Sequence, residues 1–350
     1  MTQRTLAGIL AAPLVLALLV IAATQPLPYV TYEPGLTVDV LGDTDGAEII
    51  QINGQKTYRD DGELRMTTVY VSQPDAKLNL FDVMSDWISR EDAVYPYKAV
   101  YRPDETTEQS REDGAVEMVS SQDAAIAVAL AELGYDVEPA LEVLSVSDNA
   151  PADGRLKVRD VFRSINGTPV EEPEDIIDTL QATPPGEAVT FEVLRGGEPT
   201  TVRVVPTTNE EGNQVVGIRL GTGYVFPFQV SVNIADNIGG PSAGLMFSLG
   251  IYDTLTPGSL TDGRIVAGTG TINGAGQVGP IGGIQQKIVA ARDAGAELFL
   301  VPPDNCADAL GSQNGDMRLV RAPTMHSATD SIKAWVDDPD ADLPTCKGNA

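Results

Sequence analysis

The sequence predicts an α+β or α/β chain of several domains behind an N-terminal transmembrane helix. Three observations lead to this fold class. An apolar run extends from Leu6 to Ala23, alternating runs typical of β-strands recur through the middle of the chain, and two glycine-rich segments, 239–244 and 279–287, each lead into a helical pattern. At 350 residues the chain is long enough for two or three domains, and its 42% hydrophobic content supports real cores.

The N-terminal apolar run, interrupted only by Gly8 and Pro13, just reaches the length of a membrane span. Arg4 and the terminal amine precede it, so the positive end is expected to stay in the cytoplasm and the bulk of the chain to lie outside. We therefore assign residues 1–28 to a single-pass anchor in the cell membrane. A cleaved signal peptide is the alternative, although the run contains no Ala-x-Ala cleavage signal.

Residues 29–114 form an extracytoplasmic N-terminal region in this interpretation. Strand-like runs at 48–52 and 64–71 are separated by turns rich in Asp and Gly, whereas 81–88 is more helical. Residues 102–113 are polar and charged without periodicity, which predicts a linker.

The next region, 115–207, begins with an alanine-rich helical pattern that extends to Leu133. Strand, hairpin turn, helix, strand and strand follow at 140–146, 166–167, 173–181, 189–195 and 201–205. This region resembles a PDZ domain of the type attached to bacterial proteases, most clearly at 160–170. The resemblance implies that it binds extended peptide ends by strand addition, in a groove near 133–136 and the helix. A spacer that packs on its neighbour and binds nothing is the alternative.

The two glycine-rich segments suit a serine–lysine dyad. Pro241 fits the first position of a helix, which puts Ser242 where unpaired amides favour negative charge. Lys287 shares an apolar helical face, and burial would lower its pKa enough to leave a neutral amine that can act as a base. Because His326 is the single histidine, a Ser-His-Asp triad is nearly excluded.

The stretch from Phe226 to Leu319 resembles the proteolytic domain of Lon-type serine–lysine peptidases. The matching pieces are 240–244, 267–272, 280–287, 301–302 and Asn305. By that resemblance Ser242 is the nucleophile and Lys287 the general base. The residues expected to support the oxyanion or the dyad are Gly240, Ala243 and Thr269. Gly239 and Thr271 depart from the family, which usually has Asp and Glu there. The domain is assigned to 208–340 and a C-terminal tail to 341–350.

Composition excludes several classes of partner. Net charge is −27, with 50 acidic against 23 basic residues, so nucleic acid binding is not expected. The chain contains no Gly-x-x-x-x-Gly-Lys-Ser/Thr phosphate loop, and its two cysteines and one histidine make no ligand cluster, so we expect no nucleotide, metal or other cofactor. Cys306 and Cys346 fit an oxidising location, either as a disulfide or as free thiols.

The order of segments resembles bacterial membrane-anchored PDZ domain-containing Lon-like serine proteases. That resemblance implies an ATP-independent endopeptidase that cleaves peptides or unfolded extracytoplasmic proteins, with the PDZ-like module recruiting substrate and the proteolytic domains forming a ring of identical chains. The alternative is a membrane-anchored peptide-binding scaffold whose Lon-like domain is weakly active or inactive, which the departures at Gly239 and Thr271 motivate.

Overall fold

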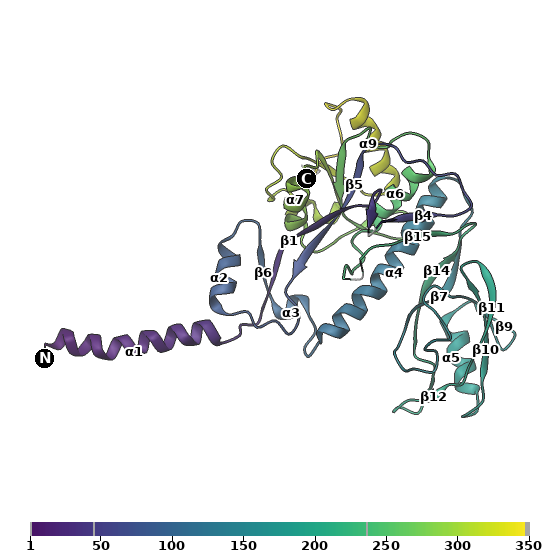
Figure 1. The fold of residues 1–350 in the computed structure, drawn as a ribbon, viewed down its shortest axis with the longest axis horizontal. Coiled ribbons are helices and arrows are strands. Elements are labelled where there is room, and N and C mark those ends of the chain that lie inside the picture. Colours follow the sequence, from purple (N-terminus) through teal and green to yellow (C-terminus); the bar gives the residue numbers. More distant parts are fainter. Residues whose placement is uncertain (1, 45, 236, 347–350) are drawn as a thin grey trace.

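The computed structural model describes residues 2–44, 46–235 and 237–346, apart from the side chains of residues 4–8. Figure 1 shows three parts: an N-terminal helix that extends away from the rest, a central α/β body, and a smaller, mainly β module beside it. The body and the module have separate hydrophobic cores.

The N-terminal helix corrects one prediction. It is α1 (Gln3–Thr24), with Pro13 inside it. Within the described residues, no helix combines the length and the apolar character needed to cross a membrane. This finding contradicts the predicted transmembrane helix and, with it, the predicted single-pass location in the cell membrane.

The body is built on a six-stranded sheet in the order β20-β19-β16-β5-β1-β6. Strands β5, β16, β19 and β20 are parallel neighbours, whereas β1 pairs antiparallel with β5 and β6. Their bounds are β1 Tyr29–Asp39, β5 Glu63–Val71, β6 Ala93–Pro96, β16 Ile265–Gly268, β19 Leu298–Val301 and β20 Arg318–Arg321. Strands from the segments 29–114 and 208–340 therefore share one sheet.

Four helices carry most of the apolar packing in the body. Helix α6 (Gly244–Leu255) is buried nearly all round and contacts α4 (Thr107–Glu132) and α9 (Met325–Asp337) in one core. Helix α7 (Ile284–Asp293) packs on β1 and β5 over a second core. The linker expected at 102–113 instead leads into α4, because Thr106 and Gln109 form a capping box that starts the helix.

The module is a sheet in the order β11-β10-β8-β7-β14, with β9 paired to β8 and α5 packed against its core. Its elements are β7 Glu138–Val146, β8 Val161–Ile165, β9 Thr168–Pro169, α5 Pro173–Ala182, β10 Val189–Arg195, β11 Glu198–Val204 and β14 Ile218–Val225. The expected Asn166–Gly167 turn joins β8 to β9, and both residues have positive φ. Sequence patterns did not indicate β14, which pairs with β7 along its length.

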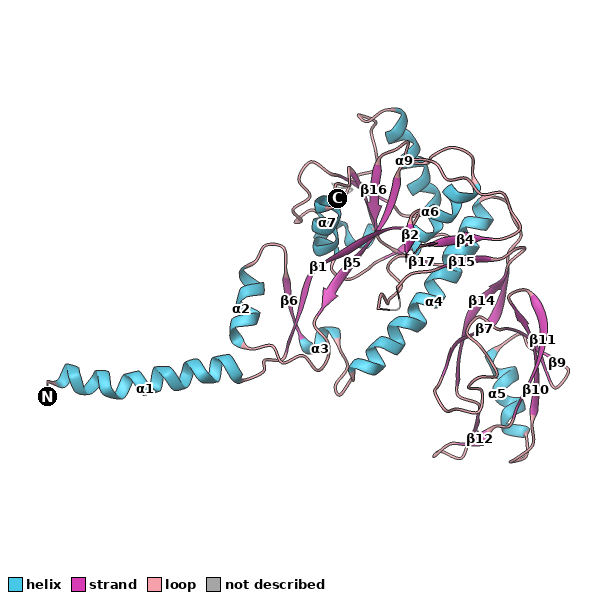
Figure 2. Cartoon of the chain, viewed as in Figure 1, coloured by secondary structure: helices cyan, strands magenta, loops and turns pink. Residues whose placement is uncertain are grey.

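The module is inserted into the body. The chain leaves the body through α4, and after β14 it returns through β15 (Val230–Val232), which pairs with β4 (Ile50–Ile52). In Figure 2, α4 runs from beside α3 (Tyr97–Val100) to the junction with the module. The remaining elements are α2 Leu80–Ile88, α8 Cys306–Ala309, β2 Asp43–Thr44, β3 Ala47–Glu48, β12 Thr207–Thr208, β13 Gln214–Val215, β17 Thr271–Ile272 and β18 Val278–Gly279.

A buried polar cluster joins α4 to the module. Arg159 Nε donates to Asp123 Oδ1 at 3.0 Å, and its guanidinium also contacts Gln122 Oε1. Burial, together with the neighbouring charge of Asp123, raises the pKa of Glu142 to about 9. Glu142 is therefore a neutral carboxyl group at neutral pH and can share its proton with Asp123.

We expect Glu142→Gln to be as stable as the wild type near pH 4 and more stable near pH 9. The raised pKa means that the folded state holds a proton that the unfolded state loses above pH 4.5, so wild-type stability falls as pH rises between these values. Glutamine keeps a neutral donor and does not titrate. Urea unfolding at both pH values measures the difference, and parallel pH profiles for the two proteins would contradict the buried neutral carboxyl.

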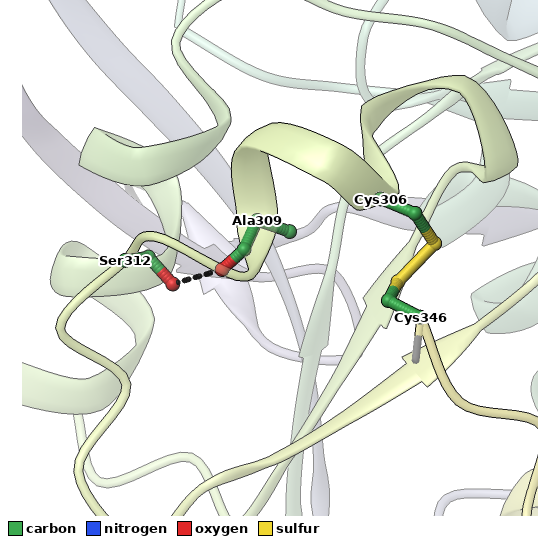
Figure 3. Close-up of a disulfide and its surroundings, with 4 residues drawn as sticks. All are labelled: Cys306, Ala309, Ser312 and Cys346. Carbon is green, nitrogen blue, oxygen red and sulfur yellow. Dashed lines mark hydrogen bonds between the residues drawn. A yellow bond between two sulfur atoms is a disulfide. The ribbon is translucent and has the colours of Figure 1, made fainter. Parts of the chain in front are cut away.

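The C-terminal segment is tied to the body by a disulfide between Cys306 and Cys346, shown in Figure 3. The Cα atoms are 5.0 Å apart, and 40 residues separate the two cysteines in the sequence. Of the two alternatives left open by the sequence, the structure has the disulfide rather than free thiols. Such a bond persists in oxidising compartments.

Replacing Cys346 with serine is expected to lower the free energy of unfolding by roughly 2–4 kcal/mol, because it releases a loop of 40 residues in the unfolded chain. Denaturant unfolding of the variant, beside the wild type with and without a reductant, measures this loss. Equal stability of the oxidised and reduced wild type would show that the bond does not restrain the fold.

Candidate active site

Ser242 lies in the turn that leads into α6. The helix begins at Gly244 with Ala243 as its N-cap, so it starts three residues after the expected Pro241. Gly240 has a φ of 89°, a backbone conformation that favours glycine. The turn leaves Ser242 half-buried at the N-terminal end of a helix, where the first amides have no partner within the helix.

Lys287 lies in the first turn of α7, 2% exposed, and its Nζ is 2.7 Å from Ser242 Oγ. Ile284 and Ile288, on the same side of the helix, are buried in the apolar core beneath α7. Burial lowers the pKa of Lys287 from 10.5 to about 7. A substantial fraction of the side chain is therefore a neutral amine at neutral pH and can accept a proton from a hydroxyl 2.7 Å away.

Thr269 follows β16 and links the Lys287 side chain to the backbone of Ser242. Its Oγ1 accepts a hydrogen bond from Lys287 Nζ at 3.1 Å and donates to the carbonyl oxygen of Ser242 at 3.0 Å. The same carbonyl accepts the Gly270 amide at 2.8 Å. Thr269 is 1% exposed, so these bonds form away from competing water.

Of the five site residues predicted from the sequence, the structure brings some together and not others. Ser242, Lys287 and Thr269 meet through direct contacts, and Ala243 is the next residue in the turn. The Gly240 amide, in contrast, donates to Gly114 O in α4 at 2.8 Å, so it is already engaged. Within the part of the chain that the structure describes, the amides of Ser242 and Ala243 donate to no other backbone group.

Helix α4 also explains the departure at Gly239. A Cβ atom on Gly239 would meet the backbone of Gly114 at 3.2 Å, which is tight for any side chain. The sequence predicted a helical pattern only from residue 115 and a linker at 102–113, so it did not indicate that α4 already includes Gly114 or that the helix contacts this turn. His326 lies elsewhere, on α9, where its ring contacts Glu132 and Asp330.

A cavity of about 1030 Å³ opens beside the turn and reaches Gly239 and Gly240. Its walls include Tyr70 and Val71 of β5 and the first half of α4. Strand β16 pairs with β5 only as far as Met66, so β5 continues beyond its neighbour at this point. Within the described residues, no group of three potential metal ligands is present.

Comparison with known protein families matches two stretches of the chain. Residues 116–205 match the PDZ domain family, and residues 235–313 match the C-terminal proteolytic domain of Lon protease (S16). The chain therefore combines a PDZ domain with a proteolytic domain of the Lon type, a class of serine peptidase.

The curated relatives are Lon proteases. Lon protease 1 of Herpetosiphon aurantiacus is 42% identical over 69 residues, which are 20% of this chain and 8% of that protein. Lon protease 2 of Bacillus subtilis is 34% identical over 95 residues, 27% of this chain and 17% of that protein. The chain thus spans less than a fifth of the length of these relatives.

Among solved structures, the PDZ domain of an SdrC-like protein from Listeria innocua overlaps 23% of this chain and 92% of that chain, with 24% identity and a TM-score of 0.22. This score is too low to support an inference about function.

Proposed function

We propose that the chain is an ATP-independent serine endopeptidase in which Ser242 is the nucleophile and Lys287 the general base. The observation that carries the proposal is the 2.7 Å contact between Lys287 Nζ and Ser242 Oγ, made by a lysine that is buried among apolar side chains. An ordinary lysine is protonated at neutral pH and has no lone pair to offer. Burial lowers the pKa of Lys287, so a fraction of the side chain is the neutral amine with a free lone pair.

The reaction follows from this geometry. As Ser242 Oγ bonds to the peptide carbonyl carbon, its proton passes to Lys287 Nζ. The negative charge on the carbonyl oxygen is stabilised by backbone amides at the start of α6. The lysine ammonium then protonates the leaving amine as the C–N bond breaks. Water then attacks the acyl-enzyme as its proton passes to the same amine, and the ammonium returns this proton to Ser242 Oγ as the acyl C–O bond breaks, which releases the carboxylic acid product.

The cavity beside Gly239 suits an extended peptide. Beyond Met66, and within the described residues, the edge of β5 that faces away from β1 has no strand partner, so its backbone groups are available for strand pairing along one wall. A folded protein presents few such segments. We therefore infer that peptides and unfolded proteins are the substrates, as the sequence suggested. The predicted ring of identical chains stays a prediction.

A second cavity, of about 600 Å³, supports recruitment by the PDZ module. It lies between α5 and the segment 209–220, with Ile176, Ile177 and Ile218 among its apolar side chains. Helix α5 lines one side of this cavity, and the sequence predicted a peptide groove next to this helix. The other side of the cavity is lined by β14, whereas the sequence predicted residues 133–136 there. Within the described residues, β14 is an edge strand of its sheet. An edge strand beside a helix can accept an added peptide strand.

The test uses a denatured protein substrate, with new amino termini as the readout. Wild type is expected to cleave it without nucleotide, and Ser242→Ala to lose at least about 10³-fold in kcat/KM. Ser248→Ala is the matched control in the same helix, since among the described residues the Ser248 hydroxyl bonds only the Leu245 carbonyl. Equal activity of wild type and Ser242→Ala would exclude the proposed nucleophile.

A further inference from the structure

The turn that carries Ser242 is held from behind by α4 at two points. Gly114 O accepts the Gly240 amide at 2.8 Å, and two helical turns later Ser121 Oγ donates to Pro241 O at 2.9 Å. Ser121 is 4% exposed. Both residues lie outside the stretch that matches the Lon proteolytic domain, so that match assigns them no role.

The bond from Ser121 is unusual for a helical serine. In the middle of a helix, a serine hydroxyl commonly bonds the carbonyl of its own helix four residues earlier. Ser121 instead reaches across to the peptide that joins Pro241 to Ser242. Ser121 packs closely against the start of α6, since a Cβ atom on Gly244 would come within 2.9 Å of Ser121 Oγ.

A hydrogen bond to a carbonyl sets the direction of the next amide. In a planar trans peptide the C=O and N–H point to opposite sides. A donor on Pro241 O therefore fixes where the Ser242 amide points, which is away from α4. The Ser242 carbonyl is held in the same manner by Thr269 Oγ1 and the Gly270 amide, which fixes the Ala243 amide.

We propose that Ser121 is a positioning residue for the oxyanion site: its bond to Pro241 O holds the Ser242 amide in the orientation that receives the developing negative charge. The inference rests on the proposed function of Ser242. Preorganised donors of this kind stabilise the transition state because no reorientation is needed during the reaction.

The adjoining turn of α4 is itself restrained. Gln122 and Asp123, the two residues after Ser121, bind Arg159 of the module, and Asp123 is 1% exposed. A donor on a rigid, supported element holds its acceptor more accurately than one on a free loop. The helix backbone that carries Ser121 is thus held in place, so its hydroxyl can orient the Pro241 peptide.

The test compares Ser121→Ala with Ser120→Ala, the same substitution one position earlier in the helix, in the full chain. For Ser121→Ala we expect kcat to fall by about 10- to 100-fold on a short peptide substrate, with KM nearly unchanged. Affinity for a peptide aldehyde, whose adduct with Ser242 carries the oxyanion, should fall by a similar factor. The pH midpoint should stay where it is, because Lys287 is untouched.

Active-site titration separates these effects from misfolding, because each rate is divided by the concentration of competent sites. If Ser121→Ala matches Ser120→Ala in kcat and aldehyde affinity, or if only KM rises, the positioning role is wrong while the proposed peptidase stands. If the wild type is inactive, or if Ser242→Ala keeps full activity, the proposed function itself fails.

Discussion

Replacing Lys287 with methionine is expected to lower kcat/KM on a denatured protein by at least about 10³-fold while leaving the fold intact. The lysine amine is the group within 2.7 Å of Ser242 Oγ that can take its proton. Methionine is similar in length and suits the apolar surroundings of Lys287 in α7. The loss should therefore appear in the chemical step and not in folding.

The matched control is Lys333→Met. Lys333 is exposed on α9, and its Nζ contacts the hydroxyl of Tyr252 at 3.0 Å. That variant should keep wild-type activity. Retention of activity by Lys287→Met, with a circular dichroism spectrum like that of the wild type, would show that another group activates Ser242.

The second large effect is a pH dependence. Wild-type kcat/KM should rise tenfold per pH unit below about pH 7 and level off above it, because the neutral amine of Lys287 is the active form and burial lowers its pKa to about 7. An ordinary lysine would shift the midpoint to 10.5. Initial rates on a short peptide between pH 5 and pH 10 measure the profile. A midpoint above pH 9 would contradict a neutral amine at neutral pH.

Stability should follow the same titration. Below about pH 7 the folded state carries a buried ammonium group, whereas the unfolded lysine stays charged up to about pH 10.5, so wild-type stability rises with pH between these values. Lys287→Met lacks this penalty. The variant should be more stable than the wild type at pH 6, and the difference should shrink by pH 10. A constant difference across this range would mean that the lysine is not desolvated.

The two central residues of the candidate site could be singled out because their signals are local. Ser242 follows Gly-Gly-Pro at a helix start, and Lys287 lies on an apolar helical face, so each is visible within about ten residues. Their meeting could not be derived from spacing, since it depends on how α6 and α7 pack on opposite faces of the sheet. The resemblance to Lon-type peptidases supplied that pairing, and with it Thr269.

What the sequence did not reveal depends on long-range pairing. The alternation in 64–71 predicted a strand but not its neighbours, and β5 proved to pair with β16, about 200 residues away in the chain. Strand β14 lies beyond the expected end of the module at 207, and its place beside β7 is a tertiary contact without a local pattern. The contact between α4 and the turn that carries Ser242 is also a tertiary contact without a local sequence pattern.

Capture of the acyl-enzyme tests most directly whether Ser242 is activated by Lys287. A slowly hydrolysed peptide ester is mixed with the protein, quenched in acid and analysed by peptide mass mapping. The wild type should carry the acyl group on Ser242, and Lys287→Met should form that adduct at least about 10³-fold more slowly. An acyl group on another residue, or equally fast acylation of Ser242 in both proteins, would contradict the dyad.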